Sequence, residues 1–420
     1  MKPMKHKPIY ILLLWLLTIL SAQAQDPLKR SIPDYPFVNL EKNKIVYPDD
    51  SLSMERFFSK LDTLLFTGQG HLNIMHIGGS HVQAGVFSQQ MRDNLLNLCP
   101  GLTAGRGLVF PYMQTNTPAS YSISRTGEWN YCRNAVAFDT QLGLTGASVT
   151  TSDTAASFSI VTREKNPRDL TPIFDFNLVK ILGYGDLVPV VHFNDKIIQG
   201  VYNPQEGSYT FRLPDYTDSL YVDFSQKAGT FTVTGVYLDN GMPGITYHGI
   251  GVNGAKVESY LNCENFERDL RLVQPDLVIF GIGINDAAAD GFTKEKFKRD
   301  YDQLIGLIHK VSPDCALLFV TNNDSYKSIK KKKKTHYQVN PNGAIAQQAF
   351  MELGKKHHAA VWDFFDIMGG LQSMEQWEKQ DMAKKDKVHF TSSGYALIGD
   401  LLFNALMDRY IEHITNNSQH

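Results

Sequence analysis

The sequence predicts an α/β protein whose doubly wound parallel sheet is interrupted by an inserted all-β sandwich. After residue 244, apolar runs of strand length alternate with helical stretches, and strands spaced by helices pair in parallel through crossovers. A strand-to-helix unit of the same kind lies near residues 72–98. Between the two, short alternating runs separated by turn residues are typical of a β sandwich. The chain of 420 residues also exceeds one ordinary core, since a domain takes ~100 to 200 residues.

The N-terminus predicts a signal peptide over residues 1–24. It has a lysine-rich start, an apolar stretch over residues 9–20 and a small-x-small cleavage site at residues 22–24. We therefore expect a secreted or periplasmic protein that is cut near Ala24. A retained anchor is the alternative, but the apolar stretch is shorter than the ~20 residues that span a bilayer, so no stable membrane insertion is expected.

Residues 25–114 are expected to form the first part of the parallel-sheet domain. An amphipathic pattern over residues 53–66 predicts a helix, and the apolar run 72–77 predicts a buried strand. Two glycines and Ser80 follow, before a helical stretch over residues 83–98. Ser80 therefore lies at a strand-to-helix turn.

Residues 115–240 are expected to form the inserted β sandwich. Pairs such as Asn166-Pro167 and Asn203-Pro204 mark turns between its strands. The clearest predicted strands cover residues 157–162, 190–193, 209–213, 220–224 and 230–238.

Residues 241–420 are expected to complete the parallel-sheet domain. Its predicted strands cover residues 245–250, 277–281, 316–321 and 360–364, and its predicted helices residues 255–273, 294–311, 344–357 and 393–411. Ser80, Gly254 and Asn285 each follow a predicted strand. Because ligands of such sheets bind outside the carboxyl ends of the strands, we expect the three residues to face one crevice.

Asp386 and His389 are the candidate partners of Ser80. A serine hydroxyl is a weak nucleophile unless an adjacent base takes its proton, and His389 can be that base. A carboxylate three residues earlier in a turn can fix the imidazole tautomer and stabilise its charged form. The sequence thus predicts a Ser80, His389, Asp386 triad with acid and base close together near the C-terminus.

Four short motifs resemble the SGNH (GDSL-like) hydrolase superfamily, which has a flavodoxin-like fold. They occur in the family's order: Gly78-Gly79-Ser80, Gly254 within Ile250-Gly-Val-Asn-Gly-Ala, Gly283-Ile284-Asn285-Asp286, and Asp386 to His389. The resemblance implies a carboxylic ester hydrolase in which Ser80 attacks an ester carbonyl. It further implies that the backbone amides of Ser80 and Gly254 and the side-chain amide of Asn285 bind the oxyanion.

The chain is more closely similar to bacterial peptidoglycan O-acetylesterases, which have Ser-His in the first motif and a carbohydrate-binding-like jelly-roll module before the second. Ser80-His81 and the predicted insert fit that plan. The similarity implies an acylated polysaccharide substrate, with peptidoglycan O-acetyl esters favoured. One departure is Gly79, which replaces the aspartate of the usual first motif. A catalytically impaired glycan-binding relative and a lipase or thioesterase therefore remain the alternatives.

Several nearby residues have two interpretations. His81 is a substrate-binding candidate or a structural histidine. Asp363 and Asp366 cap a helix or orient His389 in place of Asp386. The lysines at 330–334 form a solvated surface loop or attract anionic glycan. The glycines between Gly249 and Gly254 match a dinucleotide-binding pattern, but tight strand-to-helix packing explains them, since no acidic residue follows where a ribose needs it.

Composition excludes other classes. The 41 basic and 43 acidic side chains give a net charge of -2, so bulk charge does not point to nucleic acid. The four cysteines have no zinc-finger spacing, and no metal or other cofactor is expected. We expect these cysteines to be buried free thiols.

Overall fold

The computed structural model describes residues 28–417, with gaps at residues 52, 99, 114–116, 119, 137–138, 163–173, 226–227 and 332–333. The predicted signal peptide and its cleavage site lie outside the described residues. Of the helices that are described, none has the length and apolar character to cross a membrane.

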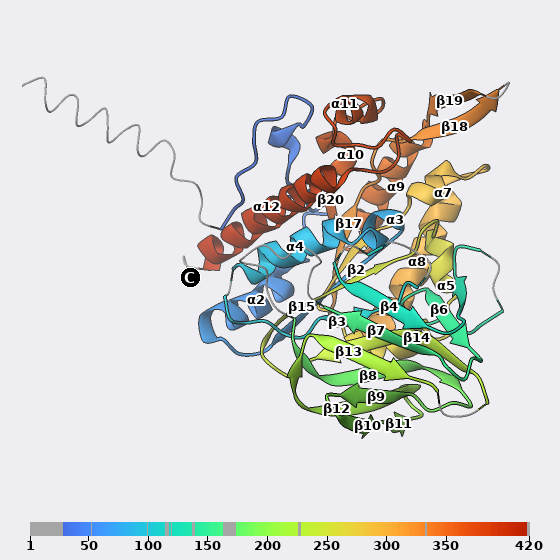
Figure 1. Cartoon of the computed structure of the whole chain (residues 1–420). Coiled ribbons are helices and arrows are strands. Elements are labelled where there is room, and N and C mark those ends of the chain that lie inside the picture. The colour runs from blue at the N-terminus through green and yellow to red at the C-terminus, as the bar shows by residue number, and fades with distance from the viewer. Residues whose placement is uncertain are drawn as a thin grey trace, which may run out of the picture.

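A six-stranded sheet forms the centre of the larger domain in the described part of the chain (Figure 1). Its strand order is β1-β20-β17-β16-β2-β15, and every neighbouring pair is parallel except β1 with β20. The strands are Ile45–Val46 (β1), His71–Gly78 (β2), Gly244–Gly251 (β15), Leu277–Gly281 (β16), Ala316–Val320 (β17) and Ala360–Trp362 (β20).

Helices cover both faces of this sheet. One face packs against α2 (Glu55–Thr67), α4 (Val86–Leu96) and α12 (Ser392–Asn417). The other packs against α5 (Val257–Leu261), α6 (Phe266–Val273), α8 (Lys294–Val311) and α9 (Asn342–Lys356). Side chains alternate along each strand, so Leu72 and Ile74 of β2 enter the first cluster and Met75 and Ile77 enter the second. The predicted doubly wound sheet is confirmed.

Two predicted helices are each broken in two. The stretch 83–98 becomes α3 (Ser80–Gln83) and α4, because Gly85 between them adopts φ +83°. The stretch 255–273 becomes α5 and α6, and the Asn265 amide at the break donates to the Leu142 carbonyl instead of continuing the helix.

Antiparallel strands between Gly107 and Asp239 form two sheets packed face to face around their own apolar cluster. This β insert begins before the expected residue 115, because β3 (Gly107–Val109) pairs with β14 (Phe231–Asp239). One sheet contains β4 (Ser122–Thr126), β7 (Ser157–Val161), β9 (Val190–Phe193), β10 (Lys196–Gln199) and β13 (Ser219–Asp223). The other contains β3, β14, β5 (Asn130–Arg133), β6 (Ala147–Thr151), β8 (Phe176–Gly185), β11 (Val201–Asn203) and β12 (Ser208–Thr217).

A hairpin replaces the surface loop expected around residues 330–334. It consists of β18 (Tyr326–Lys331) and β19 (Lys334–Val339) and projects from the parallel-sheet domain beyond α9 (Figure 1). The sequence suggested a loop because lysines dominate it. Tyr326 is buried at the base of the hairpin and fastens β18 to the rest of the domain, which supports the pairing of the two strands.

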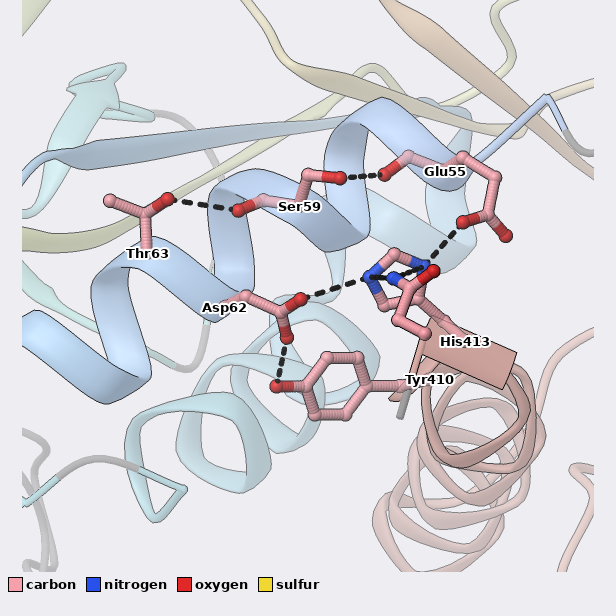
Figure 2. A network of polar contacts seen from close by, with 7 residues as sticks. Glu55, Ser59, Asp62, Thr63, Tyr410 and His413 are labelled. Atoms are coloured by element: carbon pink, nitrogen blue, oxygen red, sulfur yellow. Dashed lines mark hydrogen bonds and ion pairs between the residues drawn. The ribbon is translucent and has the colours of Figure 1, made fainter. Parts of the chain in front are cut away.

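A polar network joins α2 to the C-terminal part of α12 (Figure 2). His413 has only 3% of its surface exposed, and its ring contacts Glu55 through Nδ1 and Asp62 through Nε2, the latter at 2.9 Å. Tyr410 also donates to Asp62, at 2.7 Å. Burial alone would lower the pKa of His413, but these two carboxylates raise it above its usual value.

The cysteines that the structure describes are free thiols. Cys263 and Cys315 are buried, as expected, whereas Cys132 is only partly buried, and Cys99 lies outside the described residues.

Candidate active site

Ser80, His389 and Asp386 lie in hydrogen-bond contact at the carboxyl edge of the parallel sheet. Strand β2 ends at Gly78, and Ser80 is the first residue of α3. Its Oγ lies 2.8 Å from His389 Nε2, and His389 Nδ1 lies 2.9 Å from Asp386 Oδ2. Because an ionised carboxylate can only accept, Nδ1 carries the proton and Nε2 is free to accept from the Ser80 hydroxyl. A short turn thus connects acid and base, although Ser80 is some 300 residues away.

The Asp386 carboxylate is held in place by the turn that follows it. Its Oδ1 accepts from the backbone amides of Val388 and His389, both at 2.9 Å. Partial burial acts to raise the pKa of Asp386, but the hydrogen bonds from the His389 ring and these two amides outweigh it and hold the pKa well below its usual range. Asn323 donates to the Val388 carbonyl at 3.0 Å and fixes the turn from the end of β17. Asp386 therefore stays ionised beside His389.

The Asn285 side chain and the loop that carries Gly254 lie beside the turn that precedes Ser80. A Cβ placed on Gly79 would lie 3.2 Å from Asn285 Nδ2, 3.7 Å from the Ala255 oxygen and 3.9 Å from the Val252 oxygen. The loop that carries Gly254 and the Asn285 side chain therefore flank this turn together. Asn285 is the second residue of α7 (Ile284–Ala288), and its Nδ2 donates to the Ala255 carbonyl at 2.9 Å. Gly254 has φ +86°, a conformation that favours glycine.

Two buried side chains that the sequence did not single out brace the Gly254 loop. Gln83 Oε1 accepts from the Asn253 amide at 2.5 Å, and the Asp286 carboxylate accepts from the Val257 amide at 3.3 Å. Burial raises the pKa of Asp286 to about 7. Asp286 stands in the recognised Gly-x-Asn-Asp motif, which gave a signal for it, whereas nothing in the sequence places Gln83 beside a loop 170 residues away.

His81 lies behind the reacting groups. Its Nδ1 shares a hydrogen bond of 2.7 Å with the Tyr395 hydroxyl, and its ring centroid lies 5.4 Å from that of His389. Burial, together with His389, lowers the pKa of His81 to about 3, so its ring is neutral at physiological pH. These contacts support a structural part for His81, and substrate contact stays a prediction.

Other residues weighed from the sequence do not reach Ser80. Asp363 caps α10 (Phe364–Ile367) and accepts from Thr321 at 2.9 Å, as the capping interpretation expected. Asp366 pairs with Lys42 at 2.7 Å. The carboxylate that contacts His389 is that of Asp386, and not that of Asp363 or Asp366. A Cβ on Gly251 would lie 2.3 Å from the Gln83 amide, so close packing accounts for the glycines of the apparent dinucleotide motif.

The β insert reaches this edge of the sheet. A Cβ on Gly254 would lie 3.5 Å from the Ala135 side chain, and one on Gly146 would lie 2.9 Å from Val252. Beside Ala135, Val136 has 52% of its surface exposed. The insert thus forms one border of the candidate site. Among the described residues, no group of three or more acidic, histidine or cysteine side chains is arranged to hold a metal ion.

Comparisons with known proteins agree with this arrangement. Residues 215–397 match the model of the GDSL-like lipase/acylhydrolase family, a stretch that includes Gly254, Asn285, Asp386 and His389. A search of curated proteins finds no match. A solved structure of a peptidoglycan O-acetylesterase is similar with a TM-score of 0.72 at 18% identity, over 88% of this chain and 99% of that chain.

Two further solved structures are similar over a smaller part. A GDSL-like lipase from Parabacteroides merdae has a TM-score of 0.30 at 21% identity, over 39% of this chain and 72% of that one. A family two carbohydrate esterase from Cellvibrio japonicus has a TM-score of 0.25 at 11% identity, over 69% and 99%. The family match over residues 215–397 and the similar fold, taken with the site geometry, support an esterase of the GDSL-like type, with a fold that resembles that of a peptidoglycan O-acetylesterase.

Proposed function

We propose that this protein is an exported serine esterase that removes acetyl groups from carbohydrate, with O-acetylated peptidoglycan as its first candidate substrate. The observation that carries the proposal is the hydrogen-bonded series from Ser80 through His389 to Asp386, beside Asn285 and the Gly254 loop. Export follows from the predicted signal peptide, with cleavage near Ala24.

In the proposed reaction Ser80 Oγ attacks the acyl carbon, and its proton passes to His389 Nε2. The negative charge that develops on the carbonyl oxygen is stabilised by the amides of Ser80 and Gly254 and by Asn285 Nδ2. Collapse breaks the bond to the sugar oxygen, which leaves with the proton from His389. A water activated by His389 then releases acetate and restores Ser80. Asp386 stays ionised throughout and stabilises the imidazolium.

The exposure of the site supports a polymeric substrate. The side chains of His389 and Asp386 are 34% and 46% exposed, so a bulky chain can approach them. The border formed by the insert at Ala135 would lie beside a bound glycan.

The test compares the mature protein with its Ser80→Ala variant. Release of acetate from O-acetylated peptidoglycan and hydrolysis of p-nitrophenyl acetate, butyrate and octanoate are measured for both. We expect activity that prefers acetate and is lost in Ser80→Ala. Equal rates for the two folded proteins would contradict the serine mechanism, and retained binding to peptidoglycan without hydrolysis would favour a glycan-binding function. A preference for octanoate would favour a lipase.

A further inference from the structure

Lys387, which lies between Asp386 and His389, is anchored far from the reacting atoms. Its Nζ donates to Glu375 Oε1 at 3.0 Å, from α11 (Met374–Lys379), and lies 3.8 Å from Glu378 Oε2 on the same helix. The ammonium group also stands 4.7 Å from the centre of the Tyr326 ring, at the base of the β18–β19 hairpin. Only 18% of the Lys387 side chain is exposed. The charge of Lys387 is therefore engaged, and most of its side chain is shielded from solvent.

The backbone of Lys387 has an uncommon conformation that the turn requires. Its φ is +57°, in the left-handed region that residues with a Cβ rarely adopt. Its carbonyl accepts from the Tyr326 amide at 3.1 Å, and its own amide donates to the Lys384 carbonyl at 3.0 Å. This reversal of the chain lets the Val388 and His389 amides point back at the Asp386 carboxylate.

The contacts of Lys387 differ from an ordinary surface ion pair. Exposed pairs are worth little because two long side chains must be ordered in water. Here one ammonium group is shared by a carboxylate and an aromatic face, in a partly buried site. The hydrogen bond from Lys387, followed by one from the Tyr326 hydroxyl, lowers the pKa of Glu375 below its usual value, so Glu375 is ionised and accepts from both.

We infer that Lys387 is a positioning residue: its anchored side chain holds the turn in the left-handed conformation that aligns Asp386 and His389 with Ser80. The inference rests on the proposed roles of those three residues. Among its described contacts, Lys387 reaches none of the reacting groups through its side chain, so it acts through the turn alone. The hairpin base and α11 are thereby coupled to the geometry of the triad.

The test begins with four variants assayed with p-nitrophenyl acetate. Lys387→Ala removes the anchor, and Lys387→Gly removes it while making the left-handed conformation easy. Lys387→Arg retains charge and reach. Lys385→Ala is the matched control. Lys385 is exposed on the same loop, and it takes no part in the contacts that anchor Lys387 to Glu375, Glu378 and Tyr326. Displacements below 1 Å in an active site can cost about tenfold in rate, because a full 1 Å costs ~100-fold.

We expect kcat to fall about tenfold in Lys387→Ala and Lys387→Gly with KM within about twofold, and Lys387→Arg to recover most of it. Glu375→Ala should lower kcat in wild type but add nothing in Lys387→Ala. Rates of Lys387→Ala equal to those of Lys385→Ala would overturn the inference, as would full activity in Lys387→Gly. Ser80→Ala is assayed alongside to separate two failures. If Ser80→Ala stays active, the proposed serine mechanism is wrong. If Ser80→Ala is inactive and Lys387→Ala is unaffected, only the inference about Lys387 is wrong.

Discussion

Gly79 offers a prediction whose size can be worked from the structure. The φ of Gly79 is -97°, outside the left-handed region, so Gly79→Ala introduces no left-handed strain. Its new Cβ would stand 3.2 Å from Asn285 Nδ2, whereas ordinary contacts begin at 3.4 Å. Asn285 must therefore move by at least ~0.2 Å, although its amide is held at 2.9 Å from the Ala255 carbonyl.

A shift of this size in a proposed oxyanion donor has a limited cost. If 1 Å costs ~100-fold in rate, a few tenths of an ångström cost about 0.5 to 1 kcal/mol, or about two- to sixfold in kcat. Removal of the donor in Asn285→Ala should cost ~100- to 1,000-fold. The effect of Gly79→Ala should then vanish in the Asn285→Ala background, because the contact that causes it is gone.

The assay is steady-state hydrolysis of p-nitrophenyl acetate by the two single variants and the double variant, with circular dichroism as the check on folding. Gly306→Ala in α8 is the matched control, since a Cβ there meets no atom within 4 Å. We expect it to leave kcat unchanged. The reasoning is refuted if Gly79→Ala lowers kcat by the same factor with and without Asn285, or if it raises KM and leaves kcat intact.

Three further predictions concern titrating groups. Asp386→Asn should lower kcat by up to ~10,000-fold in hydrolysis of p-nitrophenyl acetate, as the loss of the correct tautomer does in other triads. His413→Gln should destabilise the protein more at pH 6 than at pH 9. Because Glu55 and Asp62 raise the pKa of His413, its contribution is fully present below the unfolded pKa of ~6.5 and is lost as the pH rises through the higher folded value; a margin that grows with pH in urea unfolding would contradict this. Asp286→Asn should gain stability relative to wild type as the pH rises from 5 to 8, since the raised pKa of about 7 means that ionisation opposes folding; a constant difference in urea unfolding would exclude this.

The parallel sheet and its site were predictable because their signals are local. Strands buried on both faces appear as continuous apolar runs, and each of the site motifs follows or precedes such a run within a few residues. The carboxyl-edge rule then places Ser80 and Asn285 together without any knowledge of distances. The same reasoning gave Asp386 as the partner of His389, since the two are three residues apart.

The remainder depends on contacts between distant segments. The sequence predicts a loop here because its lysines hide the alternation, and the buried Tyr326 that fastens the hairpin packs against Lys387, 61 residues later. Asn323 braces one loop of the site through the Val388 carbonyl, and Gln83 braces the other through the Asn253 amide; every residue has such backbone groups, so neither contact leaves a trace in the partner's sequence. The helix break near Asn265 depends on the hydrogen bond from its amide to the Leu142 carbonyl of the insert, and helical periodicity contains no information about that contact.

The replacement of the family's aspartate by Gly79 is best understood together with the insert. A side chain at residue 79 would press on Asn285, and a side chain at residue 254 would approach Ala135 of the insert. Both sides of the proposed oxyanion site are thus closely bordered, on one side by the Ser80 turn and on the other by the β sandwich. The Gly254 loop is in turn tied down by Gln83 and Asp286. Preorganisation here comes from packing and from these two buried acceptors, and an aspartate at residue 79 would have to displace Asn285 to fit.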